Sequence, residues 1–94
     1  MNLANIKSAI KRNKQNEKRR VLNRVYRGRA RTFVKNAREK IADENLDEAR
    51  TATLQAISEL DKAASKGVIH RNNAARRKSR LMKHLAALET KQSA

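Results

Sequence analysis

The stretch "SKGVIHRNNAARRKSRL", Ser65 to Leu81, joins two segments of helical spacing and decides how the chain turns between them. Gly67 suits the left-handed position just past a helix C-terminus, so we expect the preceding helix to end at Lys66. Val68 and Ile69 are expected to tuck under the turn before the next helix begins. The stretch therefore predicts a turn and a helix start rather than a catalytic loop.

The segment before this turn, residues 45–66, has the spacing of an amphipathic helix with a capped start. Asn45 suits the N-cap, and Glu48 three residues later makes a variant of the capping box. The apolar face has mostly small side chains: Leu46, Ala49, Thr53, Ala56, Ile57, Leu60 and Ala64. The outer face is expected to be solvated: Glu48, Gln55, Glu59 and Lys62.

The segment after the turn, residues 71–90, repeats an apolar stripe at helical spacing. The stripe holds Ala74, Leu81, Leu85 and Leu88. The far face holds the cations Arg76, Arg80 and Lys83. We expect the tail after Glu89 to be frayed.

The beginning of the chain predicts one long amphipathic helix. Its later part, residues 21–43, has an apolar stripe and an almost purely cationic opposite face. The stripe is Leu22, Tyr26, Ala30, Phe33, Ala37 and Ile41. The cationic face begins with Arg20 at the end of the preceding segment and continues with Arg24, Arg27, Arg31, Lys35 and Arg38. Gly28 inside this helix costs about 1 kcal/mol relative to Ala. Close approach of a phosphate and simple tolerance are both open as its explanation.

Residues 1–20 form a basic arm of the same helix. Ile6 and Ile10 fall out of phase with the apolar stripe, so the arm cannot face the same core and should project beyond it. Like charges four residues apart repel along the arm. We therefore expect the arm to be disordered in the free protein and helical when an anionic partner neutralises it.

Three helices with short connections predict an all-α fold. We expect one domain, residues 1–94, folded as a three-helix bundle with a long basic N-terminal helix extending beyond the bundle. Many of the apolar residues are Ala, and the only aromatic residues are Tyr26 and Phe33. The core should therefore be small.

The charge balance indicates an anionic partner. Lys and Arg number 24 against 9 Asp and Glu, which gives a net charge of +15. The net charge is +12 in residues 1–40, −4 in residues 41–65 and +7 in residues 66–94. Two basic segments around an acidic one are typical of a binding surface. Basic side chains clustered by helix face favour nucleic acid.

The sequence gives no support to catalysis or metal binding. His70 and His84 are the only histidines, and no Asp or Glu stands at a spacing suited to pair with either. The absence of Cys excludes thiolate ligands, and no nucleotide-binding or protease motif is present. We expect no enzyme activity, cofactor, metal or small-molecule substrate. No apolar run approaches the roughly 20 residues of a membrane span, so we expect no membrane partner.

Composition alone does not separate RNA from DNA. A histone-like architectural DNA-binding protein would share the charge, and a basic adaptor for an acidic protein is a further alternative. Tyr26 and Phe33 lie on the core stripe, so recognition should be of backbone shape rather than by base stacking. Asn5, Asn72 and Asn73 are candidates for hydrogen bonds to sugars or base edges. First-turn capping is an equal alternative for the last two.

Two segments resemble a known family. "ANIKSAIKRNKQNEKRR", Ala4–Arg20, and "LDKAASKGVIHRNNAARRKSRL", Leu60–Leu81, closely resemble the bacterial small-subunit ribosomal protein S20 family. The resemblance covers nearly the whole length. It implies a three-helix bundle that is a structural constituent of the small ribosomal subunit and binds 16S rRNA directly, stabilising its fold through backbone contacts. It further implies a cytoplasmic protein, present as a monomer within the ribosome.

The resemblance also implies which residues contact the rRNA. In the arm these are Asn5, Lys7, Ser8, Lys11, Arg12, Lys14, Lys18, Arg19 and Arg20. Around the turn and the third helix they are Lys66, His70, Arg71, Asn72, Arg76, Arg77, Lys78 and Arg80. The helical wheel, rather than a motif, adds Arg24, Arg27, Arg31, Lys35, Arg38 and Lys83.

Two further expectations concern single positions in this surface. Ile10 stands where the family pattern leads us to expect a basic residue, and an apolar side chain there would pack against a sugar or a base face. The N-terminus of the third helix favours an anion, so a phosphate is predicted there beside Arg71 and Arg76.

Overall fold

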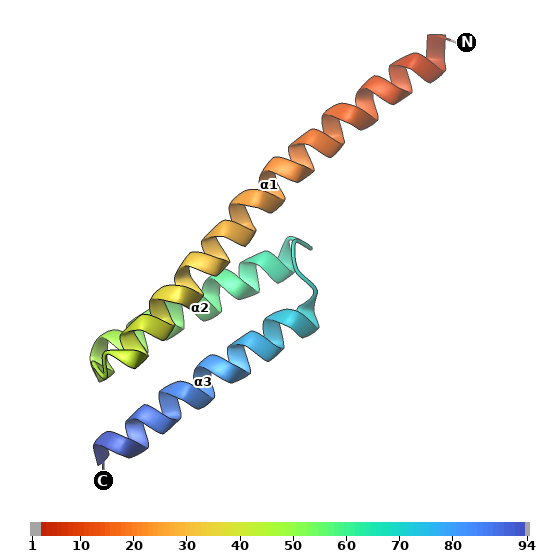
Figure 1. Ribbon diagram of the computed structural model, residues 1–94. Helices are drawn as coiled ribbons and strands as arrows, with labels where there is room; N and C mark the ends of the chain where they lie inside the picture. The colour runs from red at the N-terminus through yellow and green to blue at the C-terminus, as the bar shows by residue number, and fades with distance from the viewer. Residues whose placement is uncertain (1–2, 94) are drawn as a thin grey trace.

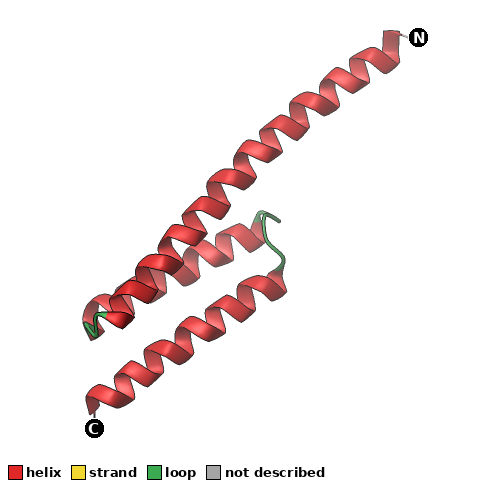
Figure 2. Cartoon of the chain, viewed as in Figure 1, coloured by secondary structure: helices red, strands yellow, loops and turns green. Residues whose placement is uncertain are grey.

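The chain folds into three helices joined by short turns (Figures 1 and 2). They are α1 (Leu3–Ala42), α2 (Leu46–Ser65) and α3 (Arg71–Ser93). The computed structural model describes residues 3–93, with side chains from residue 6 onward, so residues 1, 2 and 94 and the side chain of Asn5 lie outside it. The described residues contain no strand, and the predicted all-α bundle is confirmed.

The first helix is twice as long as the second, and this difference sets the shape of the molecule. At about 1.5 Å per residue, its 40 residues span about 60 Å. Figure 1 shows its first half projecting beyond the other two helices, and the Cα atoms extend over 73 × 20 × 13 Å. Every residue from Ile6 to Leu22 is exposed. The predicted extension of this helix beyond the bundle is therefore confirmed.

The core is made mainly of small side chains. α2 contacts both other helices, whereas α1 and α3 contact each other much less. The buried cluster comprises Ala30, Val34 and Ala37 from α1, Ala52, Ala56, Leu60 and Ala63 from α2, and Val68, Ala74 and Leu81 from the turn and α3. Tyr26 and Phe33 pack against the edge of this cluster. Ala at most core positions lets the helices approach closely.

The turn after α2 is a Schellman motif, which closes the helix and part of the core together. Gly67 has a φ of 73°. Its N–H donates to the carbonyl of Ala64 at 3.0 Å, and the N–H of Val68 donates to the carbonyl of Ala63 at 2.9 Å. These bonds satisfy carbonyls that the helix end leaves free. Val68 is buried and Ile69 packs half-buried against the core, so the predicted glycine position and the two predicted tucked residues are confirmed.

The start of α2 is capped by Asn45, as predicted. Its Oδ1 accepts a hydrogen bond from the N–H of Glu48 at 3.3 Å. The Glu48 carboxylate turns to α1 rather than back to the cap, and its Oε2 lies 3.1 Å from Nζ of Lys40. Of the two hydrogen bonds of a capping box, the one accepted by the Asn45 side chain is therefore present. The Glu48 side chain, which would make the other, instead links α2 to α1.

Leu22 does not lie in the core, and the prediction that placed it there is wrong. It is 45% exposed. α1 and α2 run antiparallel, with Arg29 beside Glu59 and Lys40 beside Glu48. Seven residues before Arg29, Leu22 is therefore level with a point seven residues after Glu59, where α2 has already ended. The phase of Leu22 is right, but no partner helix reaches it.

Glu59 is buried rather than solvated, which corrects the predicted outer face of α2. It is 5% exposed. Its Oε1 lies 3.2 Å from Nη2 of Arg29 on α1 and 3.6 Å from Nζ of Lys62. Because α2 packs against two helices, its flanks are covered as well as its apolar face. A carboxylate at such a position needs a cation beside it, and Arg29 supplies one.

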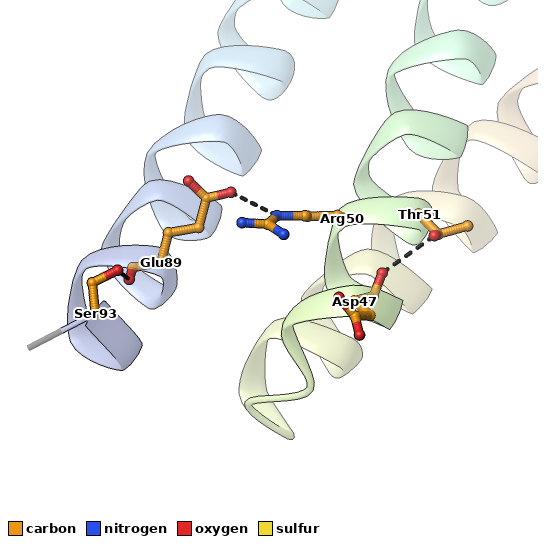
Figure 3. Close-up of polar contacts among 5 residues, drawn as sticks. All are labelled: Asp47, Arg50, Thr51, Glu89 and Ser93. Atoms are coloured by element: carbon orange, nitrogen blue, oxygen red, sulfur yellow. Dashed lines mark hydrogen bonds and ion pairs between the residues drawn. The ribbon is translucent and has the colours of Figure 1, made fainter.

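The third helix continues to Ser93, past the tail that was expected to fray. Figure 3 shows Arg50 of α2 reaching across to Glu89 of α3, with Nε and Oε1 3.0 Å apart. Nearby, Oγ of Ser93 donates to the carbonyl of Glu89 at 2.8 Å, and Lys91 pairs with Glu44. The two ion pairs hold the end of α3 against the start of α2 and the turn before it, and the Ser93 bond closes the last turn of α3 itself.

Candidate nucleic-acid interface

The arm presents lysines and arginines to solvent. Four lysines share one face because they recur at intervals of four, three and four residues: Lys7, Lys11, Lys14 and Lys18. Among the described residues of the arm, Glu17 and Arg20 form the only ion pair, with Oε1 and Nη2 2.7 Å apart. The other cations of the arm, Arg12 and Arg19 included, are exposed and have no carboxylate partner in the described part of the chain. Their charge is open to an external anion.

A groove of about 500 Å³ opens on the cationic face where α1 leaves the bundle, and we call it the arginine groove. It is lined by Asn16, Arg19, Arg20, Asn23, Arg24, Arg27, Gly28 and Arg31. The helical wheel predicted four of these arginines on one face. It missed the two asparagines, whose only signal is that they lie seven residues apart and so share a side of the helix.

A second concave site, the junction pocket, lies where α1 meets the turn and the start of α3. Its volume is about 310 Å³, and it is lined by Arg27, Ala30, Arg31, Val68, Ile69, His70, Asn73 and Arg77. Nη2 of Arg27 donates to the carbonyl of Val68 at 3.4 Å, and Nε of Arg77 donates to Oδ1 of Asn73 at 2.9 Å. Neutral acceptors orient these two arginines without neutralising them, so the pocket keeps its positive charge.

The start of α3 is capped by His70. Its Nδ1 accepts from the N–H of Asn72 at 3.1 Å. Asn73 accepts from Arg77, so neither asparagine provides the cap. The first turn of α3 contains no acidic residue, and its positive end faces the junction pocket without a negative side chain of its own.

The structure separates other predicted contacts from these two concave sites. Lys78 bridges to α2, with its Nζ 2.9 Å from Oδ1 of Asp61. Arg71 and Arg76 are exposed, but the concave surface at the start of α3 is lined by other arginines. The remaining predicted contacts are exposed on their helices or on the turn: Ser8, Lys35, Arg38, Lys66, Asn72, Arg80 and Lys83.

The side of α1 opposite the arginine groove has an apolar strip, largely exposed, that the sequence did not predict. Val21, Leu22, Val25 and Tyr26 line a groove of about 550 Å³. Lys14, Glu17, Lys18 and Arg29 form its rim. The strip was missed because Leu22 was assigned to the core and the valines to no face.

Five of the nine acidic residues gather at the far end of the bundle. Those around the turn between α1 and α2 are Glu39, Asp43, Glu44, Asp47 and Glu48. Figure 1 places this turn at the opposite end of the bundle from the turn that precedes α3. The molecule is therefore electrically polarised along its length, with the arm and the junction pocket toward the positive side.

Two other kinds of site find no support in the part of the chain that the structure describes. Within residues 3–93, no group of three or more histidine, aspartate or glutamate side chains is placed to hold a metal ion. None of the described helices is long and apolar enough to cross a membrane.

The fold and its surface are typical of a small helical protein that lies along a polyanion. A model of the family described as ribosomal protein S20 matches residues 4–86. The chain belongs to this family, whose members are ribosomal proteins and not enzymes, as the sequence predicted.

Individual relatives are similar over nearly their whole length, and each is named small ribosomal subunit protein bS20. The protein of Thermomicrobium roseum is 51% identical over 86 residues, covering 92% of this chain and 87% of its own. That of Geobacter sulfurreducens is 53% identical over 81 residues, covering 86% and 93%. That of Streptomyces griseus is 47% identical over 87 residues, covering 93% and 99%.

Proposed function

We propose that this protein is a structural constituent of the small ribosomal subunit that binds 16S rRNA directly, as a monomer, in the cytoplasm. The observation that carries the proposal is the half of α1 that leaves the bundle with exposed and mostly unpaired cations. Such a helix gains no stability from a core, and its like charges repel. An RNA that surrounds it supplies the missing counter-charge. The names of the relatives support the choice of RNA over DNA.

The two concave sites are proposed to hold two stretches of RNA backbone at the same time. The arginine groove faces one side of α1, and the junction pocket lies between α1 and α3. Guanidinium groups form paired hydrogen bonds with phosphate and stay charged when partly covered. Binding of this kind recognises the shape of a folded RNA, because phosphates are read and few bases are.

The proposed contacts are the predicted cations and asparagines of the arm, of α1 and of α3. Arg27, Arg31 and Arg77 are the strongest of them, because they meet in one pocket. Lys78 is the weakest, because Asp61 already lies beside its charge. His70 contributes mainly by capping α3 and so placing the first turn of that helix at the pocket.

A salt-titrated binding assay tests the proposal. The full chain is bound to 16S rRNA, to an unrelated structured RNA and to duplex DNA at several concentrations of sodium chloride. If 6–10 phosphates are neutralised, affinity for each polyanion should fall by about 10³–10⁵ between roughly 50 and 200 mM salt. We expect a tight complex at physiological salt on 16S rRNA alone. Equal affinity for all three would mean a general polyanion binder, and preference for the duplex would mean a DNA-binding protein.

Two single substitutions with the same change in charge sharpen the assay. Arg31→Gln removes a cation shared by both concave sites. It should weaken rRNA binding and lower the salt slope by about one. Arg50→Gln removes an exposed cation on α2 that pairs with Glu89. It should change affinity little, and an equal effect of both would contradict the proposed interface.

A further inference from the structure

On the basis of the function proposed above, we propose that Gly28 marks a subsite where one RNA phosphate group lies against the backbone of α1. The phosphate would approach the helix more closely than any side chain at this position allows. Gly28 belongs to the lining of the arginine groove. The ligand proposed for this subsite is a phosphodiester group of the bound RNA strand.

Gly28 has no structural reason to be glycine. Of the glycines in the chain, only Gly67 has the positive φ that favours this residue. A Cβ added at Gly28 would meet no atom within 4 Å, so no neighbouring helix requires the space. α1 runs as one helix from Leu3 to Ala42 (Figure 1), so the glycine does not end or break it. A helix interior without these needs is more stable with Ala.

The surroundings of Gly28 suit a phosphate. Arg24 lies one turn before it and Arg31 one turn after it, and both line the same groove. These positions are about 6 and 4.5 Å away along the helix axis. Two guanidinium groups can therefore donate to one phosphate from both sides. The missing Cβ leaves room for the phosphate between them, as glycine does wherever a backbone and a ligand approach closely.

A different explanation makes Gly28 a weak point that loosens the arm. It lies near the place where α1 leaves the bundle, since Ala30 is the first buried residue among those described. The two explanations predict opposite changes in the affinity for RNA when Gly28 is replaced by Ala. A loosening glycine raises the cost of ordering the arm, so replacing it by Ala should strengthen RNA binding. A phosphate subsite is filled by the new side chain, so the same replacement should weaken binding.

The test uses Gly28→Ala and Gly28→Leu in the full chain. Ala and Leu are both strong helix formers, so both variants should raise helical content by circular dichroism and favour folding about fivefold. Affinity for 16S rRNA should nevertheless fall about tenfold for Gly28→Ala and further for Gly28→Leu. The salt slope should fall by about one if a phosphate contact is lost.

Thr32→Ala is the matched control. Thr32 is exposed one turn after Gly28, on the same helix but outside the arginine groove. Its replacement also improves helix propensity, yet it removes atoms rather than adding them. We expect higher stability with unchanged or tighter rRNA binding. Weaker rRNA binding by Thr32→Ala would show that a more stable α1 lowers the affinity by itself. The weaker binding of the Gly28 variants would then need no excluded phosphate, and the subsite would be overturned.

Other outcomes would overturn the subsite as well. Unchanged or tighter binding by both Gly28 variants would exclude it, and so would weaker binding with an unchanged salt slope, because the excluded group would then be uncharged. Failure of the proposed function has a separate signature. In that case the wild-type chain itself would show no preference for 16S rRNA over an unrelated structured RNA.

Discussion

The two glycines of this chain occupy opposite backbone environments. Gly67 has a left-handed φ of 73° at the end of α2, whereas Gly28 lies in the regular interior of α1. A side chain is strained in the first setting and favoured in the second. The same substitution should therefore change stability in opposite directions at the two positions.

Gly67→Ala should lower the free energy of unfolding by about 1–2 kcal/mol, because Cβ crowds the following carbonyl in the left-handed region. The loss would also weaken the turn that buries Val68. Urea unfolding of the free protein measures it, with Gly28→Ala as the control that should gain stability in the same assay. An unchanged midpoint for Gly67→Ala would mean that the turn relaxes without strain.

Residues whose environment is set by their neighbours in the chain could be predicted from the sequence. Asn45 caps α2 and Gly67 ends it because the hydrogen bonds involved span only a few residues. Leu22 and Glu59 could not be placed in this way. Their burial depends on where the partner helix ends and on which flank it covers, and helical phase alone contains neither.

At the scale of the element, α1 is one helix with two unlike halves. Its second half packs Ala30, Val34 and Ala37 into the core. Its first half has only exposed side chains from Ile6 to Leu22. The structure gives both halves the same geometry, and their energetics differ, since most helical stability in proteins comes from tertiary packing.

Amide hydrogen exchange on the free protein should divide α1 in two. We expect amides of residues 6–20 to exchange fast, because unsupported helix with repelling charges opens easily, and amides of residues 34–41 to exchange slowly. Adding 16S rRNA should protect the first group. Strong protection of the arm without RNA would contradict the predicted folding on binding.

At the scale of the whole molecule, the net charge of +15 opposes compaction. Ion pairs between helices oppose this repulsion only in part. An exposed pair such as Arg50 with Glu89 contributes little. The attraction between Arg29 and the buried Glu59 is offset by the cost of removing that carboxylate from water. Added salt screens both the repulsion and the ion pairs. We expect the free energy gained from weaker repulsion to exceed the free energy lost from weaker ion pairs, so the free protein should become more stable.

Raising sodium chloride from about 20 mM to 0.5 M shortens the Debye length to a few ångströms. We expect a gain of about 1 kcal/mol in the free energy of unfolding, a rise of roughly 4–8 °C in Tm. Thermal unfolding followed by circular dichroism measures it. Chloride is used rather than sulfate because a divalent anion is attracted more strongly to the cations of the arginine groove. A fall in Tm over this range would show that the ion pairs outweigh the repulsion.

The candidate interface could be predicted face by face but not as an assembled surface. Periodicity placed Arg27 and Arg31 on the cationic side of the first helix, and the turn motif marked His70 and Arg77. That all four line one pocket depends on how α1 and α3 pack around α2, and on the tight turn that brings the start of α3 beside α1. Which residues of two helices lie side by side is set by the packing between the helices, and the sequence of one segment alone does not determine it.

The acidic end around the turn between α1 and α2 also affects how the molecule moves before contact. A body with opposite charges at its two ends is a dipole, and the field of a polyanion exerts a torque on it. Electrostatic steering of this kind favours encounters in which the positive end meets the RNA. Glu39, Asp43 and Asp47 would then influence the rate of encounter without ever touching the partner.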